Sequence, residues 1–277
     1  MKISSSIVIY NSLEKDIQTV VTCVADSIID AIYVLDNSSN DSKREFIHAL
    51  SQKVIYIQGH GNIGYGSAHN IALHEAIDKG SDFHLILNPD IRVSPESISV
   101  LLSYMQEHND IVYILPKVVY PDGTMQYLCK LLPTPFDLIF RRFIPNTKYA
   151  QKLNDRYTLR NSGYDKIINP PCLSGCFMFL RMNTIKENNI FFDERFFMYC
   201  EDFDFIRRLH QIGKTIFYPN ISIIHDHAKE SFKSKKMMFE HIKSAIKYFN
   251  KWGWFYDNER KMMNKRILSE VSFLEDK

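Results

Sequence analysis

The sequence predicts an α/β protein with a mostly parallel, Rossmann-like sheet flanked by helices and a helical appendage at the C-terminus. In the first 116 residues, short apolar runs rich in β-forming residues alternate with segments of helical periodicity. Such alternation is typical of βαβ units, whose strands are parallel. After Lys229 the periodicity is helical. A chain of 277 residues, 45% of them hydrophobic, is long enough to bury a large core.

Five apolar runs in the N-terminal half are predicted strands. They are Ser5–Tyr10, Ile32–Leu35, Val54–Ile57, His84–Leu87 and Ile111–Leu115. In two segments between these runs, apolar residues are spaced as on one face of a helix. These residues are Ala68, Ile71, Ala72, Ala76 and Ile77, and then Ile98, Leu101, Leu102 and Met105.

The second half of the chain divides into a less regular middle and a helical tail. Residues 131–169 contain prolines and a cluster of Arg and Lys, so we predict an irregular insertion or flap there. Regular patterning resumes at Cys172–Met182 and continues through the apolar runs "TIFYP" and "SIIHDH". We therefore predict an α/β domain over residues 1–228 and a basic, amphipathic helical tail over residues 229–277.

The residues that directly follow the predicted strands are the first candidates for a binding site, because ligands of parallel sheets bind beyond the carboxyl ends of the strands. They are Asn11, "DNSSND" (Asp36–Asp41), "GHGNIGYGSAHN" (Gly59–Asn70) and "NPD" (Asn88–Asp90). Function is therefore sought first in these segments.

Asp90 and His225 are candidate ligands of a divalent metal. Asp90 follows a predicted buried strand, and Pro89 removes a backbone donor, which holds the carboxylate at the rim of the sheet. Mg²⁺ and related ions bind one or two protein oxygens together with the oxygens of a diphosphate. A neutral imidazole at His225 could complete such a shell. The alternatives are an ordinary turn at Asn88–Asp90 and a structural histidine at position 225.

The segment "NIGYGSAHN" is a candidate phosphate-binding loop. Its glycines allow close approach of the backbone, and a predicted helix follows at once. It is neither a GxGxxG after the first strand nor a Walker loop ending in GK[ST]. A glycine turn that leads into a helix is the alternative. The segment "DNSSND" has two interpretations: its acid accepts a hydrogen bond from a base or a ribose, or it forms an Asx turn.

The segment "FFDERFFMYCEDFDFIRRL" (Phe191–Leu209) combines five carboxylates with seven aromatic rings. Apolar residues of its second half have helical spacing, which places Glu201 and Asp202 at the start of a helix. Carboxylates gain about 0.3–1 kcal/mol there from the helix dipole. For Asp202, a cap and a functional acid both remain open. For Asp193 and Asp204 we expect either helix caps or an arginine partner such as Arg195, Arg207 or Arg208.

Charge and cysteine content exclude several classes of protein. The formal net charge is +2, but eleven Lys and Arg lie between Lys229 and Arg266, against four acids. No nucleic-acid-binding motif accompanies them, so we expect no nucleic-acid partner. Five cysteines without a CxxC pair predict reduced thiols. The N-terminus lacks the pattern of a signal peptide and no apolar run reaches about 18 residues, so we expect a cytoplasmic protein.

Together these motifs are more specific than any one of them. Their order is "VIYN", "LDNSSND", "GNIGYGSAHNIA", "LILNPDI", "PDGTMQ", "SGCFMFLR", "FDERFFMYCEDFDFIRRLHQIGK" and "YPNISIIHDH". This order closely resembles the family 2 glycosyltransferases of GT-A fold. Within them it is most similar to the bacterial rhamnosyltransferase-like branch that builds surface polysaccharides. The resemblance extends from about Ile3 to His227 and does not cover the tail.

The resemblance implies a reaction and a set of site residues. The reaction is inverting transfer of a sugar from a nucleotide-diphosphate donor in one displacement, with Mg²⁺ or Mn²⁺. Asp202, beside Glu201, matches the catalytic acid of the ED motif, and Asp90 matches the last acid of the DxD motif. His225 matches the histidine that faces the metal or the diphosphate. Donor contacts are implied for Asn11, Asp36, Asn62, Gly64 and Asn88.

An inverting transfer needs a base for the acceptor hydroxyl and positive charge on the departing diphosphate. We expect Asp202 to supply the base. We expect the metal to supply the charge, helped by Arg207, Arg208 or the basic cluster of the middle segment. Asn88 stands where the first acid of the DxD motif would be, which lowers the negative charge of the site and leaves strict metal dependence open.

The predicted acceptor is a hydroxyl of a lipid-linked oligosaccharide, with dTDP-rhamnose as the first expected donor and a UDP-hexose as the second. A sugar-nucleotide nucleotidyltransferase is one alternative, but it would need a basic, glycine-rich loop after the first strand, where Asn11–Leu13 stands. A non-catalytic sugar- or nucleotide-binding subunit is another. For the basic tail, peripheral contact with the inner face of the plasma membrane, packing on the domain and a homodimer all remain open.

Overall fold

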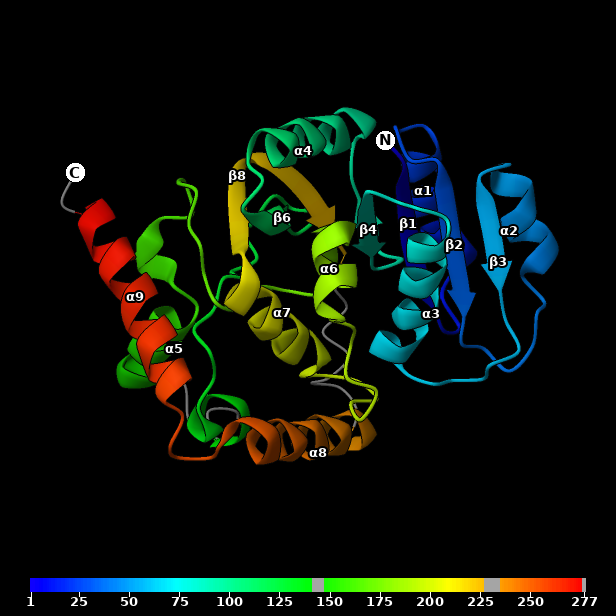
Figure 1. The fold of residues 1–277 in the computed structure, drawn as a ribbon. Coiled ribbons are helices and arrows are strands. Elements are labelled where there is room, and N and C mark those ends of the chain that lie inside the picture. Colours follow the sequence, from blue (N-terminus) through cyan, green and yellow to red (C-terminus); the bar gives the residue numbers. More distant parts are fainter. Residues whose placement is uncertain (141–146, 227–234, 276–277) are drawn as a thin grey trace.

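The structure, a computed structural model, describes residues 1–140, 147–226 and 235–275. It confirms the predicted α/β fold: one curled sheet carries helices on both faces (Figure 1). The strands are β1 (Ile3–Ile9), β2 (Ala31–Asp36), β3 (Val54–Ile57), β4 (Phe83–Leu87), β5 (Ile91–Arg92), β6 (Ile111–Val119), β7 (Phe177–Arg181) and β8 (Lys214–His225).

The sheet is parallel in its N-terminal half and mixed beyond it. The order of its eight strands is β3-β2-β1-β4-β7-β6-β8-β5. The strands β3, β2, β1 and β4 pair in parallel, as consecutive βαβ units require. β7 enters antiparallel between β4 and β6, whereas β6 and β8 are parallel and β5 pairs antiparallel with β8. The carboxyl ends of β1, β2, β3 and β4 therefore meet at one edge.

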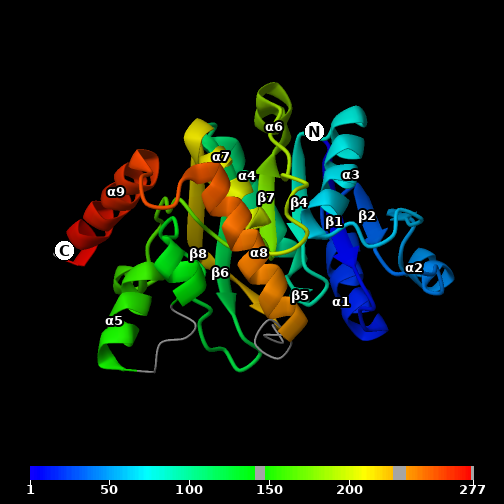
Figure 2. The same ribbon diagram turned by 90° about the horizontal axis from the view of Figure 1, so that it is seen from below.

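Helices connect these strands and cover the two faces of the sheet. They are α1 (Glu14–Ala25), α2 (Arg44–Leu50), α3 (Tyr65–Asp78), α4 (Pro95–Glu107), α5 (Lys148–Tyr157), α6 (Met182–Asn188), α7 (Glu201–Ile212), α8 (Lys235–Trp252) and α9 (Asn258–Glu275). Figure 1 shows α3 and α7 in front of the sheet and α1 behind it. Seen from below in Figure 2, α8 crosses the near side of the molecule.

Strand β1 is fully buried although its sequence is ISSSIVI. Two of its three serines are paired with buried histidines: Ser4 Oγ lies 2.7 Å from His84 Nδ1, and Ser6 Oγ lies 2.8 Å from both His84 Nε2 and His69 Nδ1. Burial lowers the pKa of His84 to about 3 and that of His69 well below its usual value. Both rings are therefore neutral and serve to satisfy polar groups inside the core.

Two segments are more regular than the sequence predicts. The run "TIFYP" and Ser222–His225 of the run "SIIHDH" form one strand, β8, whose pairing with β6 shifts register after Pro116, and a bulge of this kind accommodates Pro219. The middle segment contains α5 and short helical turns at Phe136–Phe140 and Arg160–Ser162. The Thr147 hydroxyl accepts from the Ala150 amide and caps α5, so this part of the expected irregular insertion is helical.

The predicted helical tail is present as α8 and α9. Its α8 packs on the α/β domain through a second hydrophobic cluster that also draws on the middle segment and the segment before α7. The buried members of the cluster are Leu132, Leu138, Cys172, Phe196, Cys200, Phe203, Ala245, Tyr248 and Phe249. No helix of the described chain is long and apolar enough to cross a bilayer. Four residues singled out in the sequence, Arg141, Arg142, His227 and Lys229, lie outside the described residues.

Candidate active site

Asp90 and His225 lie side by side at the carboxyl edge of the sheet. Oδ1 of Asp90 is 3.3 Å from Nε2 of His225, and the side-chain amide of Asn88 is 3.5 Å from the same nitrogen. β5, which directly follows Asp90, pairs with the end of β8, where His225 stands. The pairing of two distant strands therefore brings together the two predicted metal ligands and Asn88.

The environment of His225 favours a positive charge. Burial lowers the pKa of His225, but Cys176 and the carboxylate of Asp90 raise it, and the pKa is about 10. A cation at this position therefore suits the structure, whether it is the imidazolium or a metal ion that replaces its proton.

Gln126 fixes the orientation of the His225 ring. Its Oε1 lies 3.1 Å from Nδ1 of His225, and its Nε2 donates to the backbone oxygen of His225 at 2.7 Å. Since an amide oxygen can only accept, Nδ1 carries a proton in this contact. Nε2 is thereby directed at Asp90, which is the arrangement found where a histidine ligand is held by a second hydrogen bond.

Residues 174–176 connect this corner to the start of α7. The Asn88 amide donates to the Cys176 oxygen at 2.9 Å, and the Gly175 amide donates to Oδ2 of Asp202 at 3.2 Å. Gly175 lies so close to this side chain that an added Cβ would be 3.0 Å from Cβ of Asp202. The structure thus brings Asp202 into one connected set with Asp90, Asn88 and His225.

Glu201 and Asp202 differ sharply in their surroundings. Oδ1 of Asp202 accepts from the Phe203 amide at 2.9 Å, whereas Oε2 of Glu201 is buried and has no hydrogen-bond partner among the described residues. Burial, and then the charge of Asp202, raise the pKa of Glu201 well above its usual value. Burial also raises the pKa of Asp202, but Lys130 and backbone amides lower it. Of the two, Asp202 therefore has the surroundings that favour the ionised form more.

The backbone before α7 is strained. Tyr199 and Cys200 have φ values of 67° and 63°, in the left-handed region that non-glycine residues rarely adopt. Each such residue costs of the order of 1 kcal/mol or more, and such residues cluster at functional sites. The strained turn sets the direction of the first turn of α7, and hence of Asp202.

The predicted nucleotide-contacting residues form the other end of the same set. The Asn37 side-chain amide donates to the Gly64 oxygen at 3.1 Å, the Gly64 amide lies 3.3 Å from Oδ1 of Asn62, and the Asn11 amide donates to Ser38 at 3.1 Å. Asp36 is buried and accepts from the Ser38 amide at 2.8 Å. This contact is the Asx turn that the sequence left open. The Tyr56 hydroxyl donates to the other oxygen of Asp36 at 2.7 Å.

Gly64 is required by the fold itself. Its φ is 93°, and a Cβ there would lie 2.2 Å from the backbone oxygen of Phe197. The Tyr65 amide donates to the same oxygen at 3.1 Å. The glycine loop is therefore docked on the Phe191–Leu209 segment, and the Tyr65 hydroxyl extends this contact to the Gly175 oxygen at 2.8 Å.

Two further acids of the Phe191–Leu209 segment, Asp193 and Asp204, have basic partners. Asp193 pairs with Arg195 at 2.5 Å and Lys251 at 2.8 Å, and Asp204 pairs with Arg208 at 2.9 Å. The expectation of arginine partners is confirmed for both acids. The expectation that Arg207 or Arg208 faces the diphosphate is wrong, because Arg208 is held by Asp204 and Arg207 is buried in ion pairs with Asp257 and Glu259.

Three residues of the site were not assigned a role from the sequence. Gln126 stands in the motif "PDGTMQ" and Tyr65 in "GNIGYG", so a motif could have indicated both. Lys130, whose charge lowers the pKa of Asp202, stands in no motif. It reaches the site because its backbone pairs with Cys172, just before residues 174–176.

The residues present fit a divalent ion that shares its shell with a ligand. No group of three or more His, Cys, Asp or Glu that could hold a metal is found within residues 1–140, 147–226 and 235–275. Asp90 and His225 offer two ligand atoms, and apart from the 3.3 Å contact with Nε2 of His225 the buried Oδ1 of Asp90 has no partner in the described structure. Two protein ligands, one of them a carboxylate oxygen that only His225 contacts, suit an ion completed by diphosphate oxygens.

The chain is similar to known glycosyltransferases. The family described as Glycosyl transferase family 2 matches residues 4–204. The chain is similar to rhamnosyltransferase WbbL of Escherichia coli, with 28% identity over 228 residues that cover 79% of this chain and 76% of WbbL. It is also similar to the N-acetylglucosaminyl-diphospho-decaprenol L-rhamnosyltransferase of Mycobacterium tuberculosis, with 26% identity over 215 residues, 72% of this chain and 67% of that protein.

Solved structures share the fold. A crystal structure of S. aureus TarS aligns with a TM-score of 0.60 at 18% identity, over 99% of this chain and 71% of that chain. TarS solved with UDP aligns with a TM-score of 0.57 at 19% identity, over 98% and 71%. GalNAc-T7 solved with UDP, GalNAc and Mn²⁺ aligns with a TM-score of 0.60 at 16% identity, over 81% and 43%. The predicted GT-A fold is thereby confirmed, and the match over residues 4–204 establishes that the chain belongs to glycosyltransferase family 2.

Proposed function

We propose that this glycosyltransferase inverts the anomeric centre of its donor and that Asp202 is the base. The carrying observation is the position of Asp202: its carboxylate is held by the amides of Gly175 and Phe203, in one connected set with Asp90 and His225. In a single displacement, Asp202 accepts the proton of the acceptor hydroxyl while that oxygen bonds to the anomeric carbon and the bond to the diphosphate breaks. Glu201 remains protonated beside it and adds no second negative charge.

Asp90 and His225 are proposed to hold a divalent cation at the diphosphate. When bound, such an ion supplies positive charge that stabilises the leaving group. Asn88 contributes an amide rather than a carboxylate at this corner. Asn11, Asp36, Asn62 and Gly64 are proposed to line the nucleotide side, since they belong to the linked loops after β1, β2 and β3.

The donor is proposed to be dTDP-rhamnose, with a UDP-hexose as the second choice, and the acceptor a hydroxyl of a lipid-linked oligosaccharide. Two relatives support the sugar, since both are named as rhamnosyltransferases. The name of the mycobacterial relative includes a diphospho-decaprenol, which supports a lipid-linked acceptor. The TarS structure solved with UDP shares the fold of this chain, and on that ground alone it supports a UDP-hexose as the second choice.

The variant Asp202→Asn tests the assignment of the base. The amide keeps the shape of the side chain but cannot take up a proton, so we expect turnover to fall by at least a factor of about 100, the lower range of a general base. Donor binding, measured as the thermal shift produced by the nucleotide sugar with Mg²⁺ or Mn²⁺, should persist. Turnover close to that of the unaltered chain would overturn the assignment.

Release of free nucleoside diphosphate in the presence of acceptor separates the proposal from its alternatives. A transferase releases it in proportion to product, and a binding subunit releases none. A nucleotidyltransferase would instead release pyrophosphate. The anomeric configuration of the product, read by NMR, then tests inversion.

A further inference from the structure

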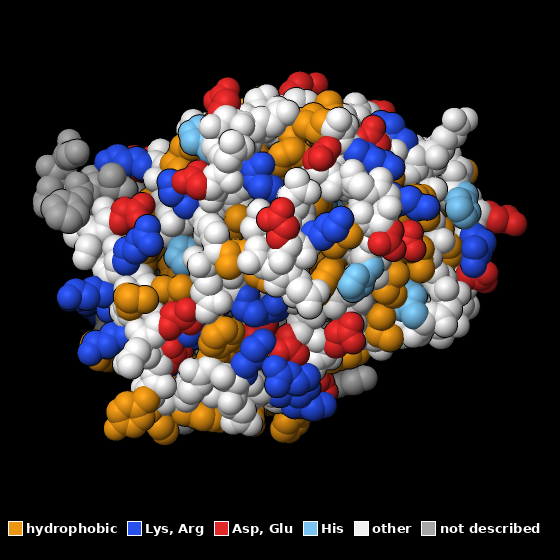
Figure 3. All heavy atoms as spheres, viewed as in Figure 1, with side chains coloured by type: hydrophobic (Ala, Val, Ile, Leu, Met, Phe, Trp, Pro, Cys, Tyr) orange, Lys and Arg blue, Asp and Glu red, His pale blue; other side chains and the backbone are white. Residues whose placement is uncertain are grey.

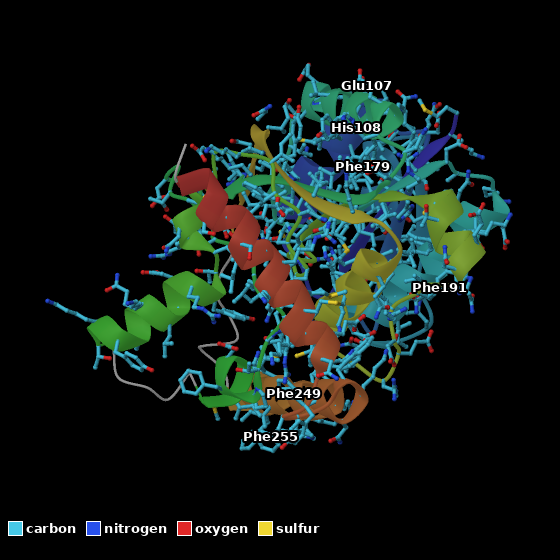
Figure 4. The ribbon with its side chains drawn as sticks, turned by 60° about the vertical axis from the view of Figure 1, so that its left-hand side comes forward. Glu107, His108, Phe179, Phe191, Phe249 and Phe255 are labelled. Atoms are coloured by element: carbon cyan, nitrogen blue, oxygen red, sulfur yellow. The ribbon has the colours of Figure 1, made fainter. Side chains whose placement is uncertain are left out.

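The turn between α8 and α9 exposes an unusual set of apolar side chains. Phe255 is 82% exposed and Tyr256 is 96% exposed. On the outward side of α8, Phe239 is 65% exposed and Ile246 is 41% exposed. Figure 4 shows Phe255 at the edge of the molecule, beyond the buried Phe249 of α8. These four residues are called here the outer patch.

The outer patch is presented by an ordered turn. Gly253 has a φ of 98°, and a Cβ there would lie 2.4 Å from the Tyr256 oxygen. The buried Arg260 guanidinium donates to the backbone oxygens of Trp254 and Phe255 at 3.3 Å and 3.5 Å. The fold therefore uses a glycine and a buried arginine to hold two aromatic rings outward, where they contribute nothing to the core.

Cationic side chains lie beside the outer patch. Lys243 lies between Phe239 and Ile246 on the same side of α8, because these three positions are spaced by four and three residues. The exposed Lys261 follows the turn on α9. Lys247 and Lys251 do not belong to this set, because Lys247 donates to the Arg195 oxygen and Lys251 pairs with Asp193 and Asp204. Exposed aromatic rings beside lysines are characteristic of helices that lie in the interface of an anionic membrane.

We propose that the outer patch docks this protein on an anionic lipid bilayer, with the rings of Phe255 and Tyr256 inserted among the headgroups and the lysines on lipid phosphates. The apolar area explains insertion, and the local excess of positive charge favours a phospholipid surface over a neutral protein partner. A second copy of the chain would bring a surface of the same positive charge against the outer patch, which is unfavourable.

This docking orients the candidate active site. In Figure 1 the strands β2 and β3 point with their carboxyl ends toward the side of the molecule along which α8 runs, and Figure 3 shows hydrophobic side chains along that lower edge. Docking through α8 and the turn would therefore turn the carboxyl edge of the sheet toward the bilayer. The use of this orientation for catalysis rests on the proposed lipid-linked acceptor. The docking itself does not depend on the proposed function.

Vesicle co-sedimentation of the full chain tests the proposal without any reference to activity. Vesicles of phosphatidylcholine with phosphatidylglycerol should bind the protein, vesicles of phosphatidylcholine alone should bind at least tenfold less, and added salt should weaken binding. The double variant Phe255→Ser/Tyr256→Ser should bind the anionic vesicles at least tenfold less. Tyr149→Ser, which removes a ring of α5 that is 71% exposed outside the patch, should bind as the unaltered chain does.

Tryptophan fluorescence supplies a second readout, because of the two tryptophans of the sequence Trp252 ends α8 and Trp254 lies in the turn itself. Anionic vesicles should shift their emission to shorter wavelength, and brominated lipids should quench it. No shift, equal binding to neutral vesicles, or undiminished binding of the double variant would overturn the proposal. So would a dimer in solution that dissociates when the two rings are removed, since the patch would then be a protein interface.

Discussion

Two adjacent acids with different surroundings can perform different tasks. Glu201 is buried with an unpartnered oxygen, whereas both oxygens of Asp202 accept backbone amides and Lys130 lies near. At such a pair, a neighbouring like charge raises the pKa of an acid and the helix dipole lowers it. In the structure, burial is the largest influence on both pKa values. Backbone amides of Gly175 and Phe203 and the charge of Lys130 lower the pKa of Asp202, whereas only a backbone amide lowers that of Glu201. This difference in surroundings favours Asp202 as the proposed base of the pair.

The rate of transfer should depend on the ionisation of Asp202. Because its pKa is raised, the base is lost at a higher pH than for an exposed aspartate, whose pKa is about 3.9. We expect kcat/KM to rise with pH through an acidic limb above that value and then to level off. The profile should be measured over the pH range in which the midpoint temperature of thermal unfolding is constant. A rate that stays level down to a pH of about 4 would contradict a raised pKa at the base.

Gln126 should control metal affinity through His225. Replacing it by Leu removes the partner of Nδ1 and frees the ring to rotate, so we expect the concentration of Mn²⁺ for half-maximal activity to rise about 10- to 100-fold. Gln126→Glu keeps an acceptor at the same place and should recover most of the affinity. If both variants needed the same metal concentration as the unaltered chain, His225 would not be oriented by this contact.

Single residues at strand ends were predictable from the sequence, but their partners were not. Asp90, His225 and Asp202 stand in motifs whose spacing reflects the fold, and the structure brings all three together. Gln126 and Lys130 act through contacts that depend on the pairing of distant strands. The role expected for Arg207 was wrong for the same reason, because its partners Asp257 and Glu259 follow about 50 residues later.

At the scale of elements, the start of α3 shows how a loop is held against a distant segment. The glycine turn was expected to approach a nucleotide, yet Gly64 already approaches the backbone of Phe197. A side chain at this position would separate the loop after β3 from the segment that leads into α7. The closeness of these two elements therefore fixes the proposed nucleotide side of the site relative to the proposed base.

Gly64→Ala should destabilise the protein more than Gly123→Ala does. Both glycines have positive φ, 93° and 82°, but a Cβ at Gly123 would meet nothing within 4 Å. The control should lose about 1–2 kcal/mol for its backbone conformation alone. Gly64→Ala adds a clash with the Phe197 oxygen and should lose clearly more, measured by urea unfolding. Equal losses for the two variants would show that the loop moves away from Phe197 without cost.

Periodicity predicted the strands of the first half because each is a separate buried run between turns. It could not predict that β7 enters antiparallel, since direction depends on the neighbours of a strand and not on its own pattern. It also missed α5, whose exposed, polar sequence follows a proline-rich segment. In both places, contacts between distant segments decide the structure.

At the scale of the whole molecule, the C-terminal helices are joined to the helix that carries Asp202. Arg207 of α7 is 1% exposed, donates to both oxygens of Asp257 at 2.8 Å, and lies 4.0 Å above the ring of Trp252. Tyr248 and Phe249 of α8 are buried against the segment before α7. The tail, expected as an appendage to the domain, therefore contributes to the support of the candidate base.

Arg207→Met should be strongly destabilising because it leaves Asp257, which is almost fully buried, and Glu259 without their cation. Removing one partner of a buried ion pair costs about 3–5 kcal/mol, which urea unfolding would measure. The matched control is Arg195→Met, which breaks the pair with Asp193 at a guanidinium that is largely exposed; we expect about 0–1 kcal/mol. Because Met fills much of the volume of the arginine, a large difference between the two variants would report the buried charges and not a cavity. Similar small losses would mean that the tail is held by the hydrophobic cluster alone, and that the position of α7 does not depend on Arg207.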